Sequence, residues 1–214
     1  MRIMAVRRSG LSYMRIDWSK MKFAIADPPY LGRANRWYGE TGCGDGYGLG
    51  KADTHPEAYL WDNPDTHKNL IQTLFNDYDG FAIALTVHSL STYMEEIKTN
   101  SRNGIRVMAW IKPSAVPSGN RIQNVWEPVI IKMPQSRKNY KAGKSCKDVL
   151  TAHPPRNGFV GAKPIEWTNW VMDAMGVQVG DTVDDLFIGS GMVSEAITSR
   201  TLTTRDNSIR FGVM

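Results

Sequence analysis

The stretch Lys22-Phe23-Ala24-Ile25-Ala26-Asp27-Pro28-Pro29-Tyr30 decides the fold of this chain. Its first five residues form a short, mostly apolar run, which is typical of a buried strand. Pro28 and Pro29 have no backbone donor and therefore stop the strand ladder. An acid, two rigid residues and an aromatic ring thus stand together at the carboxyl end of a strand, which is the edge where open α/β sheets bind ligands.

The chemistry of this stretch suits a planar ring that carries an amino group. The Asp27 carboxylate and the Pro28 carbonyl can accept hydrogen bonds from an NH2 group, and Tyr30 offers a face for stacking. A strand that ends in a proline turn with a solvated Asp27 is the simpler alternative. Four residues alone favour this simpler alternative.

Further apolar runs alternate with helical patterns or loops along the chain. This alternation predicts an α/β fold with a Rossmann-like, doubly wound and mostly parallel sheet. We expect Asp65 and Thr66 to cap a helix that Gly80 ends, and Gly176 to cap a later helix. The expected strands are 22–26, 81–87, 105–111, 125–132, 182–186 and 202–205, and the expected helices are 66–78, 91–98, 164–175 and 192–199.

Composition bounds the class of protein. A chain of 214 residues with 22% charged and 42% hydrophobic residues fits one soluble globular domain. No run is long enough to span a membrane, and we expect neither a membrane partner nor a signal peptide. Cys43 and Cys146 form no metal-ligand pattern, so we expect no metal and a cytoplasmic location. A net charge of +5 mildly favours a polyanionic partner.

Two segments stand out from the strand and helix pattern. Residues 31–58 are predicted to be a glycine-rich loop that is mobile without ligand, and its flank carries Arg33, Arg36, Trp37 and Tyr38, which suit phosphates and bases. We favour a substrate-covering loop over a plain flexible one, because it leaves directly from the predicted site. Residues 134–160 are basic and polar, and are either a solvated loop or a nucleic-acid contact segment through Lys138, Lys141 and Lys144.

A second candidate site follows the strand predicted at 182–186. Phe187-Ile188-Gly189-Ser190-Gly191 leads from Asp185 into a helix, and its glycines let the backbone approach a ligand. It is not a phosphate-binding P-loop, because no Gly-Lys-Ser/Thr follows. Asp206 stands about 20 residues on, at the tip of the next predicted strand, where an acid commonly holds ribose hydroxyls. This spacing indicates a nucleoside-containing cofactor.

The motif order resembles that of a known family. Asp27-Pro28-Pro29-Tyr30, then Lys163-Pro164, then Asp185 to Gly191 is similar to S-adenosylmethionine-dependent DNA amino-methyltransferases of the permuted (beta) group, in which the catalytic motif precedes the cofactor motif. The segments 109–113 and 126–128 resemble the strands between those motifs. The small versions carried by bacteriophages are the most similar in style.

The resemblance implies a single class I methyltransferase domain over residues 22–214. Residues 1–21 are basic and weakly patterned, and are a dispensable basic extension, an outer strand or a basic arm. The resemblance implies catalytic roles for Asp27, Pro28, Pro29 and Tyr30, with DNA rather than RNA as substrate and a monomer or homodimer as the assembly. Adenine N6 is expected over cytosine N4, because the cytosine enzymes more often have Ser in place of Asp27. The cofactor residues implied are Lys163, Pro164, Asp185, Phe187, Gly189, Ser190, Gly191 and Asp206.

The resemblance also leaves alternatives. Target recognition in the family uses a larger region where this chain has only residues 134–160, so a short or relaxed target sequence is expected. Transfer to a cytosine amine or to RNA is a second possibility. A methyltransferase-like module that binds nucleic acid without turnover is a third.

Overall fold

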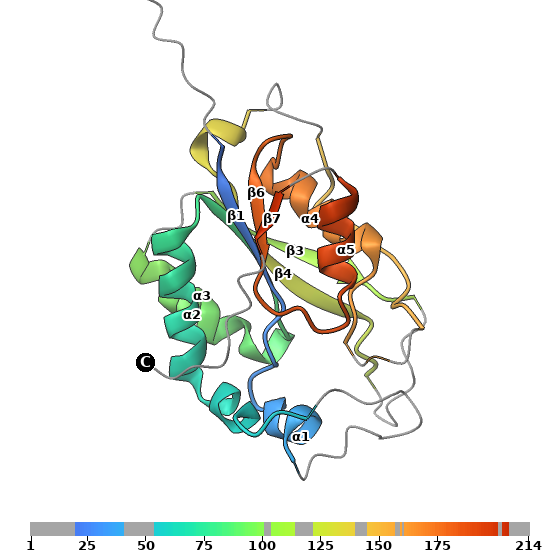
Figure 1. Ribbon diagram of the computed structural model, residues 1–214. Coiled ribbons are helices and arrows are strands. Elements are labelled where there is room, and N and C mark those ends of the chain that lie inside the picture. The colour runs from blue at the N-terminus through green and yellow to red at the C-terminus, as the bar shows by residue number, and fades with distance from the viewer. Residues whose placement is uncertain are drawn as a thin grey trace, which may run out of the picture.

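One mixed sheet runs through the centre of the molecule (Figure 1). The computed structural model describes residues 20–40, 54–100, 104–113, 122–139, 145–156, 159, 161–200 and 203–205. Within these residues the sheet has seven strands in the order β5-β3-β4-β2-β1-β6-β7. The strands are β1 (Lys22–Ala26), β2 (Gly80–Ala84), β3 (Ile105–Ile111), β4 (Trp126–Lys132), β5 (Val149–Thr151), β6 (Thr182–Asp185) and β7 (Thr203–Arg205).

Only β4 runs against the other strands of the described sheet. It is antiparallel to both β2 and β3, whereas the pairs β1–β2, β1–β6, β3–β5 and β6–β7 are parallel. The sheet is therefore mostly parallel, as predicted. All five residues of β2 and the last four of β1 are buried, which is why both read as continuous apolar runs.

Helices cover both faces of the sheet and make a three-layer, doubly wound α/β fold (Figure 1). The α-helices are α1 (Ala34–Tyr38), α2 (Pro64–Asp77), α3 (Leu90–Asn100), α4 (Ile165–Met175) and α5 (Met192–Ser199). Short 3-10 turns are η2 (Ala58–Asp62), η3 (Val87–Ser89) and η4 (Gln135–Arg137).

Two apolar clusters hold the layers together, one on each face. Trp167 of α4 and Ile197 of α5 pack on one face, and neither is exposed. Leu74 of α2 and Ile97 of α3 pack on the other face and are equally buried. Each such side chain contributes roughly 1.5–3 kcal/mol through burial, so these faces fix how the helices sit on the sheet.

The ends of the helices follow local sequence signals. α2 begins at Pro64, and the Asn63 side chain accepts a hydrogen bond from the Asp65 N–H at 3.0 Å. The predicted Asp65-Thr66 cap is therefore wrong by two residues. Gly80 does not end this helix but opens β2, because Tyr78 already stands at the C-cap. Gly176 caps α4 with φ +76°, as predicted.

The two segments that interrupt the predicted pattern contain regular structure. α1 stands within the segment predicted as a loop over 31–58, and residues 41–53 lie outside the described part. β5 stands within 134–160 and pairs with β3, so that part is a short edge strand and not a loop. The extension predicted over 1–21 is described only at residues 20 and 21.

Candidate active site

The site lies where β1 and β6 end side by side. The two strands are parallel, Ile25 is level with Asp185, and the Leu186 N–H donates to the Ile25 carbonyl at 3.0 Å. Asp27 therefore emerges next to the turn that follows β6. Two motifs about 160 residues apart in sequence are thus brought to one edge of the sheet, as the carboxyl-end rule for α/β sheets predicts.

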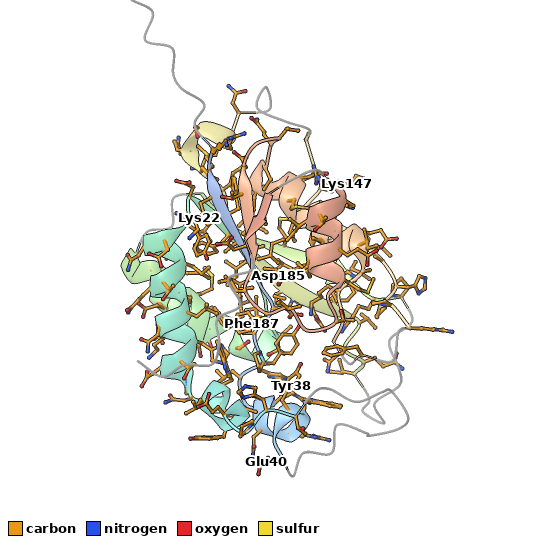
Figure 2. All side chains as sticks on the ribbon, in the orientation of Figure 1. Lys22, Tyr38, Glu40, Lys147, Asp185 and Phe187 are labelled. Carbon is orange, nitrogen blue, oxygen red and sulfur yellow. The ribbon has the colours of Figure 1, made fainter. Side chains whose placement is uncertain are left out.

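Asp185 organises the turn between β6 and α5. It is 6% exposed, and one carboxylate oxygen accepts from the Ser194 hydroxyl at 2.6 Å. The other oxygen accepts from the Phe187 N–H at 3.3 Å. The turn reaches from the sheet toward α1, with Asp185, Phe187 and Tyr38 in succession (Figure 2). Asp185 therefore braces the turn from behind and is not among the residues that line the cavity described next.

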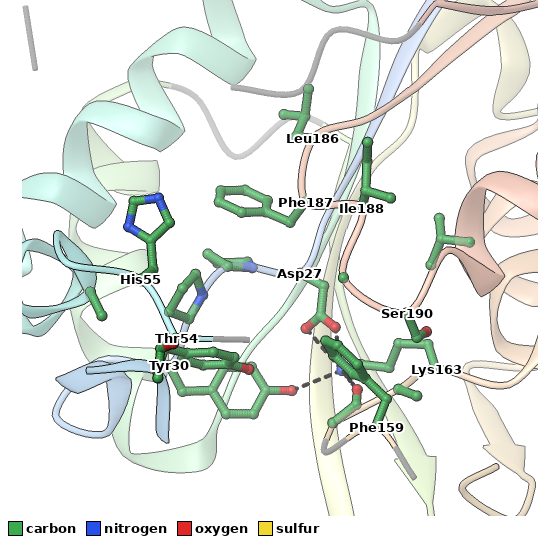
Figure 3. A pocket seen from close by; sticks show the side chains of 18 residues that line it. Asp27, Tyr30, Thr54, His55, Phe159, Lys163, Leu186, Phe187, Ile188 and Ser190 are labelled. Atoms are coloured by element: carbon green, nitrogen blue, oxygen red, sulfur yellow. Dashed lines mark hydrogen bonds and ion pairs between the residues drawn. The ribbon is translucent and has the colours of Figure 1, made fainter. Parts of the chain in front are cut away.

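A cavity of about 430 Å³ joins the two predicted motifs (Figure 3). This size is within the ordinary range for small-molecule sites. Pro164 and Gly191 lie just outside its wall. Predicted site residues that line it are Asp27, Pro28, Pro29, Tyr30, Tyr38, Lys163, Phe187, Gly189 and Ser190.

Gly189 has a backbone conformation that suits glycine, and it lies on the cavity wall. Its φ is +47°, and a Cβ built there would stand 3.6 Å from the Phe159 ring. The turn therefore presents bare backbone opposite Phe159, which also lines the cavity. Together with apolar Phe187 and Leu186 this lining fits a nucleoside-containing cofactor such as S-adenosylmethionine.

Lys163 holds Asp27 at the floor of the cavity. Its nitrogen lies 2.8 and 2.7 Å from the two Asp27 carboxylate oxygens, 3.0 Å from the Gly161 carbonyl and 3.1 Å from the Tyr30 hydroxyl, so its three N–H groups are shared among four acceptors. Lys163 is 2% exposed, whereas 22% of the Asp27 side chain is exposed. The sequence placed Lys163 with the cofactor residues; the structure brings its charge against the predicted catalytic acid.

Tyr30 connects this pair to a second one. Its hydroxyl accepts from Lys163 at 3.1 Å and donates to Glu127 at 2.9 Å. The other Glu127 oxygen accepts from the Lys112 ammonium group at 2.5 Å. Two cations and two carboxylates thus alternate around one phenol, and their formal charges cancel.

Burial dominates the electrostatics of the two lining groups. It raises the pKa of the Asp27 carboxyl, and the nearby Lys163 charge only partly offsets this. The pKa of the Tyr30 phenol is raised well above its usual value, by burial first and by the Glu127 charge second. Burial alone would also raise the pKa of Glu127, but Lys163 and Lys112 outweigh it and hold that pKa below the usual value.

The predicted nucleic-acid residues fall into two groups. Arg33 precedes α1 and Arg36 lies in it, and both are exposed at the same end of the molecule as the cavity. Trp37, also in α1, is half-buried. Lys138 follows η4, the yellow turn at the opposite end of the sheet (Figure 1), and is not brought to the cavity. Lys141, Lys144 and Asp206 lie outside the described residues.

Several contributors were missed from the sequence. Glu127 and Lys112 were assigned only to strand segments, although a charge inside the apolar run Val125 to Ile131 is a usable signal. Phe159 and His55 also line the cavity. Among the described residues no group of three or more metal-ligating side chains is arranged to hold a metal ion, and no helix is long and apolar enough to cross a membrane.

Comparison with known proteins gives structural matches only. No protein-family profile and no curated protein sequence matches this chain. The cytosine-N4-specific PvuII DNA methyltransferase matches with a TM-score of 0.59 at 11% identity, over 87% of this chain and 74% of its own. M1.HpyAVI in complex with SAM matches with a TM-score of 0.54 at 15% identity, over 87% and 80%.

A third solved structure agrees with these two. TTHA0409 from Thermus thermophilus, provisionally described as a DNA modification methylase, matches with a TM-score of 0.53 at 15% identity, over 87% of this chain and 79% of its own. Identities this low establish the fold alone. The chain has an α/β fold that matches the class I methyltransferase fold, and its structure is similar to those of DNA methyltransferases.

Proposed function

We propose that this chain is an S-adenosylmethionine-dependent methyltransferase that modifies the exocyclic amine of a DNA base, with adenine N6 as the first candidate. One observation carries the proposal. The Asp-Pro-Pro-Tyr motif and the Phe187–Ser190 turn line the same cavity, so a cofactor beside the turn and an amine beside Asp27 would meet within it. Proximity of this kind is the first requirement for group transfer.

The cavity residues divide between the two ligands. Phe187, Gly189 and Ser190 would hold the cofactor, and Asp185 would fix their turn from behind. When bound, S-adenosylmethionine supplies an electrophilic methyl group. Asp206 would add the ribose contact that the sequence predicts.

Asp27 and Pro28 would act on the amine. A base amine is a poor nucleophile because its lone pair is shared with the ring. Hydrogen bonds from both N–H groups to the Asp27 carboxylate and the Pro28 carbonyl would turn that lone pair out of the ring plane. The carboxylate would also stabilise the positive charge that develops on nitrogen, as preorganised groups do in other enzymes.

Lys163 leaves Asp27 able to do this work. A carboxylate has about four lone-pair sites, and the Lys163 ammonium group uses two of them. The remaining sites can accept an amine N–H. The raised pKa of Asp27 also makes it a better acceptor for the proton that the methylated amine must release.

A base in a duplex must leave the stack to reach the cavity, which costs a few kcal/mol. Stacking on the Tyr30 ring would return roughly 1–3 kcal/mol of this cost. The described part of 134–160 consists of η4, the short edge strand β5 and irregular chain, with Arg137 buried. Little of it is left to read bases, which supports a short or relaxed target sequence.

Mass spectrometry of nucleosides tests the proposal. DNA and RNA from methylation-deficient cells that express the protein would be digested, with Asp27→Ala expression as the control. We expect N6-methyladenine in DNA that depends on Asp27. N4-methylcytosine would establish the second candidate, which the similarity to the cytosine-N4-specific structure favours. Absence of any methylated nucleoside would refute the proposal.

A further inference from the structure

The Tyr30 hydroxyl is held from two sides. It donates to one Glu127 oxygen at 2.9 Å and accepts from Lys163 at 3.1 Å. A tyrosine ring otherwise turns about two side-chain torsions. Two hydrogen bonds at the far end of the ring fix both torsions, so the ring face that lines the cavity has one orientation before any ligand arrives.

The place of Glu127 in the sheet explains how it reaches Tyr30. Glu127 lies opposite Trp110 in the antiparallel pair of β3 and β4, and Lys112 stands two residues beyond Trp110 on the same face. The Trp110 ring lies near both cations, 5.6 Å from the Lys112 nitrogen and 5.8 Å from that of Lys163. Glu127 on β4 therefore reaches the Tyr30 hydroxyl from a position outside the cavity lining.

Lys112 offsets the energetic cost of burying the Glu127 carboxylate. Only 18% of the Glu127 side chain and 18% of the Lys112 side chain are exposed. A carboxylate buried to this extent is costly unless it is paired and hydrogen-bonded. Lys112 binds one oxygen and leaves the other to the Tyr30 hydroxyl, so the pair forms a charge-balanced anchor for the ring.

We propose that Glu127, with Lys112 as its counter-ion, is a positioning residue that fixes the Tyr30 ring in the plane on which the target base stacks. This inference rests on the proposed function. It assigns base capture, rather than the chemistry at the amine, to two residues that do not line the cavity.

The division of labour predicts a kinetic signature. Stacking on Tyr30 is the same before and during methyl transfer, so loss of ring orientation removes uniform binding. Glu127→Gln and Lys112→Met should therefore raise KM for DNA by about tenfold while kcat stays within about twofold, because a charge-assisted hydrogen bond is weakened but the amine contacts remain. Affinity for S-adenosylmethionine should not change.

The chain offers a matched control. The Tyr78 hydroxyl donates to Asp184 at 3.0 Å, and Lys22 lies 3.6 Å from the same oxygen. This is the same type of Tyr–carboxylate–Lys arrangement, but it does not line the cavity. Tyr78→Phe should leave KM for DNA unchanged even where it lowers thermal stability.

A double-mutant cycle separates positioning from general destabilisation. Because Glu127 is proposed to act through the phenol, Tyr30→Phe combined with Glu127→Gln should raise KM no further than Tyr30→Phe alone. Additive effects would show that Glu127 acts by another route. Equal KM values for wild type and Glu127→Gln would overturn the inference outright.

Fluorine NMR reports directly on the environment of the Tyr30 ring. Uniform 3-fluorotyrosine labelling gives 19F signals for the eight tyrosines, and Tyr30→Phe assigns the relevant one. We expect one sharp Tyr30 signal in the wild type, and a shifted or broadened one in Glu127→Gln and Lys112→Met. An unchanged signal in both refutes positioning. A changed signal in a protein that methylates no DNA would refute the proposed function, and the role in base capture with it.

Discussion

Two buried ion pairs stand at opposite ends of the sheet and do different things. Arg137 binds Asp181 at 3.1 Å near the start of β6, and both side chains are at most 3% exposed. Lys163 binds Asp27 at 2.7 Å beyond the end of β1, where 22% of the acid is exposed. The first pair is sealed within the protein, whereas the second lines a cavity.

The surroundings of each pair explain the difference. Asp181 also accepts from the Met21 and Gln178 N–H groups, at 3.0 and 2.7 Å, so its oxygens are committed to the backbone. Gly176 admits Arg137, since a Cβ at Gly176 would stand 2.9 Å from that of Arg137. Among the described residues Asp27 is held by the Lys163 side chain, and it keeps a face toward the cavity. Pairing with backbone fixes structure, and pairing with a side chain beside a cavity leaves an acid available for chemistry.

Breaking the sealed pair should have the largest effect on stability. Arg137→Met leaves the Asp181 charge buried without its counter-ion, and we expect the free energy of unfolding to fall by about 3–5 kcal/mol. Chemical denaturation measures this. Arg200→Met is the control, because the Arg200–Asp173 pair is 32% and 38% exposed and should cost under about 1 kcal/mol. Equal losses in the two variants would mean that burial of the ion pair does not decide its contribution to stability.

Breaking the cavity pair should instead change turnover. Asp27→Ala removes the acceptor for the target amine, and we expect kcat to fall by about 10²–10³-fold while affinity for S-adenosylmethionine is kept. Single-turnover transfer from labelled cofactor and calorimetry measure the two quantities. Asp65→Ala, at a carboxylate 74% exposed on the surface, should change neither. Near-normal turnover in Asp27→Ala would remove Asp27 from the mechanism.

Turnover should depend on pH through the Asp27 carboxyl, whose pKa is raised by burial. Its pKa is raised above 3.8, and only the ionised form supplies the negative charge that stabilises the positive charge developing on the amine. Turnover should therefore decline as pH falls through this raised pKa, by about tenfold per pH unit below it. The raised pKa also means that Asp27 contributes stability below pH 3.8 that is lost as pH rises through the folded-state pKa. A pH–kcat profile with no acid limb above pH 3.8 would contradict this.

Much of the fold was predictable because its signals are local. Continuous apolar runs marked β1 and β2, and α5 occupies the predicted residues. β5 was missed because three residues within a basic stretch give no periodicity. The sequence did not predict that β4 is antiparallel to its neighbours, because a run of apolar residues looks the same in either strand direction.

The candidate site was predictable only in part. The motifs around Asp27 and Gly189 were found because each is continuous in sequence. The anchor of Tyr30 joins Glu127 to a residue 97 positions away, and the sealed pair joins Arg137 to Asp181 across 44 positions. Such contacts depend on which strands become neighbours. Arg137 belongs to the basic segment that the sequence left open between a solvated loop and a nucleic-acid contact, yet the residue is buried.

The smallest expected effect is on S-adenosylmethionine affinity. Alanine substitutions at Gly189 and Gly180 distinguish an effect on binding from an effect of backbone strain. Gly189 and Gly180 both have positive φ, +47° and +94°, and neither would place a Cβ closer than 3.6 Å to another atom. An alanine at either position should cost about 1–2 kcal/mol of stability from backbone strain. Only Gly189 lines the cavity, so only Gly189→Ala should also weaken S-adenosylmethionine binding, by several-fold, because its methyl group reduces the room beside Phe159. Calorimetry on the two variants, each corrected for its folded fraction, decides this. Equal affinities in Gly189→Ala and Gly180→Ala would place the cofactor away from the turn.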